Sequence, residues 1–131
     1  MRFSLLLFCC CLAMSAQQVQ KGCEQPLKNE EDACCCTTYD TNVCLVKLED
    51  KVDQELNKVY QSALKRWNKD PESEELRDAQ RAWIAYRDAT CKAEAGLYRG
   101  GTIMPSVDSH CVLRVSRQRI ADLKDAYLFE R

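Results

Sequence analysis

Residues 42–67, NVCLVKLEDKVDQELNKVYQSALKRW, establish the helical character of the chain. Apolar residues recur in this stretch at steps of three and four, which places them on one face of an amphipathic helix. That face consists of Leu45, Leu48, Val52, Leu56, Val59, Tyr60, Ala63, Leu64 and Trp67. Asn42 is a suitable N-cap. The stretch therefore predicts a long helix that begins at Asn42 and buries one face.

A second helix is predicted to begin a few residues later. Asp70 is a suitable cap, and Pro71 can occupy the first helical position because its missing N–H would be unpaired there anyway. The acidic residues between positions 72 and 75 favour the positive end of the helix dipole. The pattern should stop near Gly96. Because the join around Lys69 is short, the two helices must run antiparallel.

A glycine-rich link at residues 96–101 separates this helix from a third. Thr102 can cap the third helix, and Pro105 is tolerated in its first turn. Its apolar face runs toward the C-terminus through Val112, Val115, Ile120, Leu123 and Tyr127. Residues 42–131 are therefore predicted to form a small all-α domain of three helices with an antiparallel helical hairpin.

Residues 1–16 have the features of a secretory signal peptide. Arg2 supplies a positive charge, and the mainly apolar segment 3–14 is too short to span a bilayer, which takes about 20 residues. Small residues at positions 13–16 offer a cleavage site. The sequence thus predicts a secreted or periplasmic protein without a membrane span. A lipoprotein signal is the alternative, but Phe8 stands where a small residue is needed before a lipidated Cys9.

Residues 17–41 are predicted to form an irregular, cysteine-rich arm before the helical domain. They show no apolar periodicity and contain Pro26, a charged stretch at 28–32 and four cysteines. The chain has ten cysteines among its 131 residues, and an exported chain of this kind uses them for disulfides. Three cysteines belong to the signal, so seven remain. This odd number leaves at least one thiol unpaired within the monomer, or paired with another chain.

The overall charge excludes one class of partner. The chain has 19 basic and 20 acidic side chains, a formal net charge of −1. A nucleic-acid-binding domain normally carries a basic excess on one face, so no nucleic-acid partner is expected. Gly and Pro are scarce, at four and three residues, which disfavours an all-β fold with many tight turns.

Several short motifs follow one another between Thr41 and Leu123. They are Asn42-Val43-Cys44, Asp53-x-x-Leu56-Asn57-x-x-Tyr60, Leu76-x-x-Ala79-Gln80-Arg81-Ala82-Trp83-Ile84-x-Tyr86-Arg87-Asp88-x-x-Cys91, Tyr98-x-Gly100-Gly101-Thr102, Cys111 and Arg119-x-x-x-Leu123. With these motifs in this order, the chain resembles one family, which shares the domain found at the N-terminus of the lysozyme inhibitor LprI. The resemblance implies an exported, non-enzymatic helical domain. Cys23 and the run at 34–36 depart from the family pattern.

Two disulfides are expected, one within the helical domain and one that joins this domain to the arm. A bridge between Cys91 and Cys111 would close the glycine-rich link and stabilise the fold by about 3 kcal/mol. Cys44 would then pair with one of Cys34, Cys35 or Cys36. The alternative is a metal site that combines those three cysteines with His110 and Cys111. Adjacent cysteines suit a tetrahedral site poorly, so no metal is expected.

Four polar residues, Asp53, Gln80, Arg87 and Arg119, lie on or beside the apolar faces of three different helices. They could form a ligand or catalytic cluster, or a buried hydrogen-bonded network. The structural interpretation is favoured because the sequence pairs no nucleophile with a general base and contains no phosphate loop. Asp53 and Arg87 should meet across the hairpin. No enzyme activity and no cofactor are therefore expected. Four aromatic residues are predicted to belong to the core: Tyr60, Trp67, Trp83 and Tyr86.

The link between the second and third helices is the candidate binding site. It contains Tyr98, Arg99, Gly100 and Gly101, and Arg99 is the only charged side chain between Glu94 and Asp108. Loops on a rigid scaffold often carry binding function, although the glycines could serve only the turn.

Three functional hypotheses follow from these residues and from the family resemblance. The leading one is an exported, non-enzymatic binding protein, because the chain lacks a catalytic set of residues, and the resemblance implies a lysozyme as its target. An exposed arginine would suit the cleft of such a glycosidase, which holds two acidic groups. The second is an envelope assembly module that binds another protein. The third is a cysteine-rich metal or redox protein.

Overall fold

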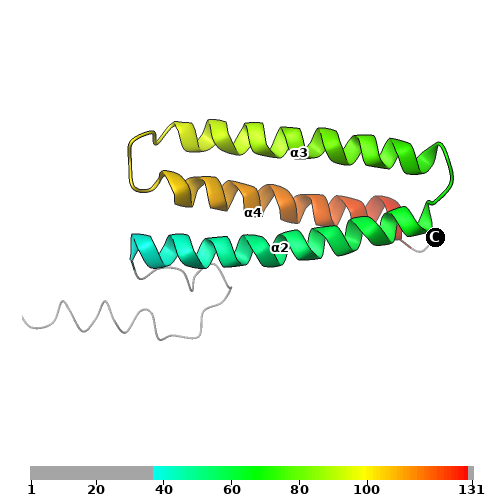
Figure 1. The fold of residues 1–131 in the computed structure, drawn as a ribbon, viewed down its shortest axis with the longest axis horizontal. Helices are drawn as coiled ribbons and strands as arrows, with labels where there is room; N and C mark the ends of the chain where they lie inside the picture. The colour runs from blue at the N-terminus through cyan, green and yellow to red at the C-terminus, as the bar shows by residue number, and fades with distance from the viewer. Residues whose placement is uncertain (1–36, 130–131) are drawn as a thin grey trace, which may run out of the picture.

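The computed structural model describes residues 37–129, which form three long helices (Figure 1). No strand occurs within these residues. The predicted all-α, three-helix class is therefore confirmed. The elements are α2 (Thr38–Arg66), α3 (Glu72–Gly96), α4 (Met104–Leu123) and a short π-helical segment η2 (Lys124–Leu128).

Two predictions lie outside the described residues: the signal peptide at 1–16 and most of the arm at 17–41. The end of the arm can be compared, and α2 begins earlier than expected there. The side chain of Thr37 caps α2 by accepting a hydrogen bond from the amide of Asp40 at 3.1 Å. Residues 38–41 are therefore helical. The expected cap, Asn42, lies inside α2 and accepts a hydrogen bond from Ser106 at 2.8 Å.

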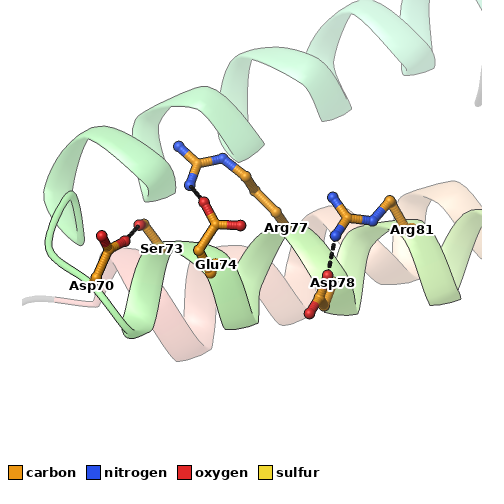
Figure 2. A network of polar contacts seen from close by, with 6 residues as sticks. All are labelled: Asp70, Ser73, Glu74, Arg77, Asp78 and Arg81. Atoms are coloured by element: carbon orange, nitrogen blue, oxygen red, sulfur yellow. Dashed lines mark hydrogen bonds and ion pairs between the residues drawn. The ribbon is translucent and has the colours of Figure 1, made fainter.

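The starts of the other two helices also differ by about one residue from the prediction. Pro71, not Asp70, occupies the cap position of α3, and Asp70 instead accepts a 2.9 Å hydrogen bond from the Ser73 hydroxyl (Figure 2). Ile103 occupies the cap position of α4, so Thr102 does not cap it. The predicted stop of α3 at Gly96 is confirmed.

Helix α4 lies between α2 and α3 and packs along both, whereas α2 and α3 have little direct contact (Figure 1). The directions of α2 and α3 are opposite, as the short join requires, and α4 runs parallel to α2. The parallel pair is tied at both ends. Ser106 bonds Asn42 at one end, and the Trp67 indole N–H donates to the Tyr127 carbonyl at 2.9 Å at the other. The two helices of the predicted hairpin, α2 and α3, are therefore held together mainly by their packing against α4.

The core contains two apolar clusters that share α4. In the larger cluster, the apolar face of α2 packs against Leu76 of α3 and three residues of α4. The smaller cluster joins Cys91 of α3 to Cys111 and Val115 of α4, and Trp83 contacts both clusters. The buried members of the α2 face are Leu45, Leu48, Val52, Leu56, Val59 and Ala63, and those of α4 in the larger cluster are Leu113, Ile120 and Leu123.

Two of the four aromatic residues predicted for the core lie at the surface instead. Trp67 is 42% exposed and Tyr86 is 59% exposed. Tyr60 and Trp83 are half-buried and pack against the core. In the part of the chain that the structure describes, no helix combines the length and apolar character needed to cross a bilayer.

Replacing Leu113 by Ala should lower the free energy of unfolding by about 2–5 kcal/mol, because its side chain is 1% exposed on the shared helix α4. Urea denaturation measures this value. Leu97→Ala is the matched control, since Leu97 is 82% exposed, and it should change stability by less than about 0.5 kcal/mol. Equal effects of the two substitutions would contradict the assigned core.

Candidate functional site

The predicted binding loop connects α3 to α4 at one end of the molecule (Figure 1). Its two glycines have a conformational role. Gly100 has a φ of +84°, which residues with a side chain rarely adopt. A Cβ atom on Gly101 would lie 3.2 Å from the Tyr98 carbonyl oxygen, which also accepts the Gly101 amide at 2.9 Å. These glycines therefore make the tight turn, and the contacts available to a partner come from their neighbours.

The neighbours of the glycines present a cation among apolar side chains. Arg99 is exposed, and within residues 37–129 its guanidinium makes no ion pair. Tyr98 is 48% exposed, Leu97 82% and Ile103 52%. Leu97 and Ile103 were not among the predicted site residues, although apolar residues beside a glycine turn were visible in the sequence. We refer to residues 97–103 as the Arg99 loop.

A disulfide joins the two helices at the base of the Arg99 loop. Cys91 and Cys111 are bonded, as predicted, with their Cα atoms 5.4 Å apart and both residues buried. A bidentate ion pair lies beside them, in which Arg114 Nη2 contacts the two carboxylate oxygens of Glu94 at 2.7 and 2.9 Å. The loop thus connects two helices that are covalently linked to each other near its base.

The disulfide argues against the alternative metal site that would include Cys111. The sulfur of Cys111 is bonded to Cys91, so it is not available as a metal ligand. Within the described residues, no group of three or more metal-ligating side chains comes together. Cys44 is disulfide-bonded too, and its candidate partners, Cys34, Cys35 and Cys36, lie outside the described residues.

The predicted polar network assembles around Trp83. The guanidinium carbons of Arg87 and Arg119 lie 5.2 and 5.9 Å from the centre of the indole ring. Arg119 Nε donates to the Gln80 side-chain oxygen at 3.1 Å. Arg87 Nη1 lies 3.5 Å from the Asp53 carboxylate, so the expected contact is present. The sequence did not reveal that both cations would lie against the same indole ring.

The burial of this network differs from the expectation in one respect. Gln80 is buried, and the Arg87 side chain is only 18% exposed, but that of Asp53 is 52% exposed. Arg87 also donates to the exposed Asp88 carboxylate at 2.9 Å. Its charge is thus paired at the edge of the molecule, where water screens the interaction. The polar residues thus form two separate pairs, Arg87 with Asp53 and Arg119 with Gln80. Arg119 Nη2 is buried and has no hydrogen-bond partner in the described part of the chain.

Replacing Arg87 by Ala should lower the free energy of unfolding by about 1 kcal/mol, since its ion pairs are solvent-exposed and its indole contact is modest. Urea denaturation with Asp53→Asn in parallel measures the loss. We expect Asp53→Asn to cost less than Arg87→Ala, because Asp53 makes no indole contact. A loss above about 3 kcal/mol would show that the pair behaves as a buried one.

These observations define a small, disulfide-bonded helical domain with one exposed loop at the end of two linked helices. The model of the lysozyme inhibitor LprI family matches residues 30–123, and the chain belongs to this family. An uncharacterized protein of Rhizobium meliloti (strain 1021) is 32% identical over 132 residues, which cover 92% of this chain and 88% of that relative. No solved structure matches the chain.

Proposed function

We propose that this chain is an exported protein that inhibits a lysozyme by binding it and catalyses no reaction itself. Membership in the lysozyme inhibitor LprI family is the observation that carries the proposal. Export is consistent with the buried Cys91–Cys111 disulfide, because such bonds persist in oxidising compartments. Around Trp83, Arg119 donates to Gln80 and Arg87 contacts Asp53, pairings that suit a structural role of these residues better than a catalytic one.

We assign the inhibitory contact to the Arg99 loop. Lysozymes cleave a glycosidic bond with two carboxyl groups in a cleft. A guanidinium offers a fork of donors that matches a carboxylate, so Arg99 is suited to enter such a cleft. The exposed side chains of Leu97, Tyr98 and Ile103 supply apolar contact area around the cation.

The base of the loop favours tight binding for a second reason. Association is weakened when a loop must lose conformational freedom on binding. The disulfide and the Glu94–Arg114 ion pair fix the two helix ends from which the loop projects. Only the residues between these anchors have to be ordered in the complex.

Lysis of bacterial cell walls tests the function most directly. The purified chain, with its disulfides formed, is mixed with lysozymes of several classes, and the fall in turbidity is followed. We expect lysis by at least one lysozyme class to be slower when the chain is present in molar excess over the lysozyme. Undiminished lysis with every class at a large molar excess would remove the proposed function.

For the surface, Arg99→Ala should weaken inhibition by about tenfold or more, the effect of losing a buried hot-spot side chain. Its melting temperature should stay close to that of the unmodified chain, because the residue is exposed. Lys58→Ala removes the same charge from an exposed position of α2 and should inhibit normally.

The two variants are compared in the lysozyme class that the unmodified chain inhibits. Full inhibition by Arg99→Ala, like that by Lys58→Ala, would place the contact outside the Arg99 loop. An equal loss in both would indicate that overall charge, and not one side chain, governs binding. Either result would overturn the assigned surface while leaving the inhibitory function intact.

A further inference from the structure

A hollow of about 440 Å³ lies where α2 ends and α3 begins. We call it the Trp67 hollow. These two helix ends meet at the end of the molecule opposite the Arg99 loop (Figure 1). Helix α3 has 25 residues and is about 37 Å long at 1.5 Å per residue, and the hollow lies beside its first part while the loop follows its last residue. The hollow is lined by Trp67, by Ala126 and Tyr127 of η2, and by Glu72, Glu75, Leu76 and Ala79 on one face of α3.

Trp67 is held in place at the mouth of this hollow. Its indole N–H donates to the Tyr127 carbonyl at 2.9 Å, and its backbone amide bonds the Ala63 carbonyl at 3.0 Å. The polar edge of the ring is therefore satisfied, yet the residue is 42% exposed. The π face of an indole carries negative electrostatic potential and attracts cations more strongly than any other aromatic side chain does.

The acidic residues at the start of α3 fall into two groups. Glu74 pairs with Arg77 at 2.7 Å, and Asp78 pairs with Arg81 (Figure 2). Glu72 and Glu75, the two that line the hollow, make no ion pair within the described range 37–129. Their charges are left available beside the indole.

Stabilisation of the helix dipole explains acidic residues in the first turn of α3 in general. It applies equally to Glu72, Glu74 and Glu75, which all lie in that turn. It does not explain why the two carboxylates without an ion-pair partner share a hollow with an exposed indole. The nearby cation Arg66 contacts the carbonyl oxygens of Leu128 and Phe129 at 3.5 Å and is not among the residues that line the hollow.

We propose that the Trp67 hollow is a second binding site, which accepts a lysine or arginine side chain of a basic partner protein. The cationic group would contact the indole face and the carboxylates of Glu72 and Glu75 together. The alkyl stem of such a side chain suits the apolar wall formed by Ala79 and Ala126. This site goes beyond the proposed function and does not depend on it.

A titration with a short cationic peptide tests the site. The purified full-length chain, with its disulfides formed, is titrated with hexa-arginine, and the two indole N–H signals are followed by NMR. The signals are assigned with a Trp67→Phe variant. We expect a saturable shift of the Trp67 signal and no shift of the Trp83 signal. Hexa-glutamate should move neither signal.

Two double variants separate the site from general electrostatics. Glu72→Gln with Glu75→Gln removes the two carboxylates of the hollow, and Glu74→Gln with Asp78→Asn removes two others from the same helix start. The first pair should weaken hexa-arginine binding by about fivefold or more, and the second by less than about twofold. Circular dichroism checks that both variants remain helical.

Three results would overturn the proposal. One is an unmodified chain whose Trp67 signal does not respond to hexa-arginine. Another is an equal response of Trp67 and Trp83, which would indicate a change in the whole fold. The third is equal weakening in the two double variants, which would attribute the binding to net charge alone. The lysozyme assay is a separate measurement, so failure of one proposal leaves the other standing.

Discussion

The burial of α4 between α2 and α3 is the constraint on which the rest of the molecule depends. Its residues face both neighbours: Leu113 and Leu123 pack into the larger cluster with α2, and Cys111 and Val115 pack against α3. Because α2 and α3 have little direct contact, the apolar face of α2 finds most of its partners on α4. A core this small gains substantially from a covalent link, and the disulfide at Cys111 joins α4 to its other neighbour.

The same arrangement produces both candidate binding surfaces. At one end, the antiparallel run of α3 and α4 forces the chain through the tight turn that displays Arg99. At the other end, α4 continues into η2, whose Tyr127 carbonyl fixes the indole of Trp67. Among residues 37–129, Arg99 at one end makes no ion pair, and neither do Glu72 and Glu75 at the other end. Helix α3 spans the distance between them. The two surfaces suit groups of opposite charge.

Much of the fold could be predicted because it depends on local pattern. The apolar steps in residues 42–67 identified the buried face of α2, and the glycine at 96 marked the end of α3. The contact between Asp53 and Arg87 followed from the short join and the known rise per residue. The central position of α4 could not be predicted, since periodicity tells which face of a helix is buried but not which helix covers it. Trp67 continues the apolar pattern of α2, but it occupies the C-cap position, where it is 42% exposed in the described part of the chain.

Hydrogen exchange of the native chain tests the central position of α4 most directly. Amide protection is measured across all three helices, and the free energies of opening are compared with the free energy of global unfolding in denaturant. If α4 is packed between both other helices, the amides between Leu113 and Ile120 exchange only through global unfolding. We then expect no partly unfolded state in which α4 is open while α2 and α3 remain folded. Exchange of α4 through a lower-energy opening, with α2 and α3 still protected, would contradict this account.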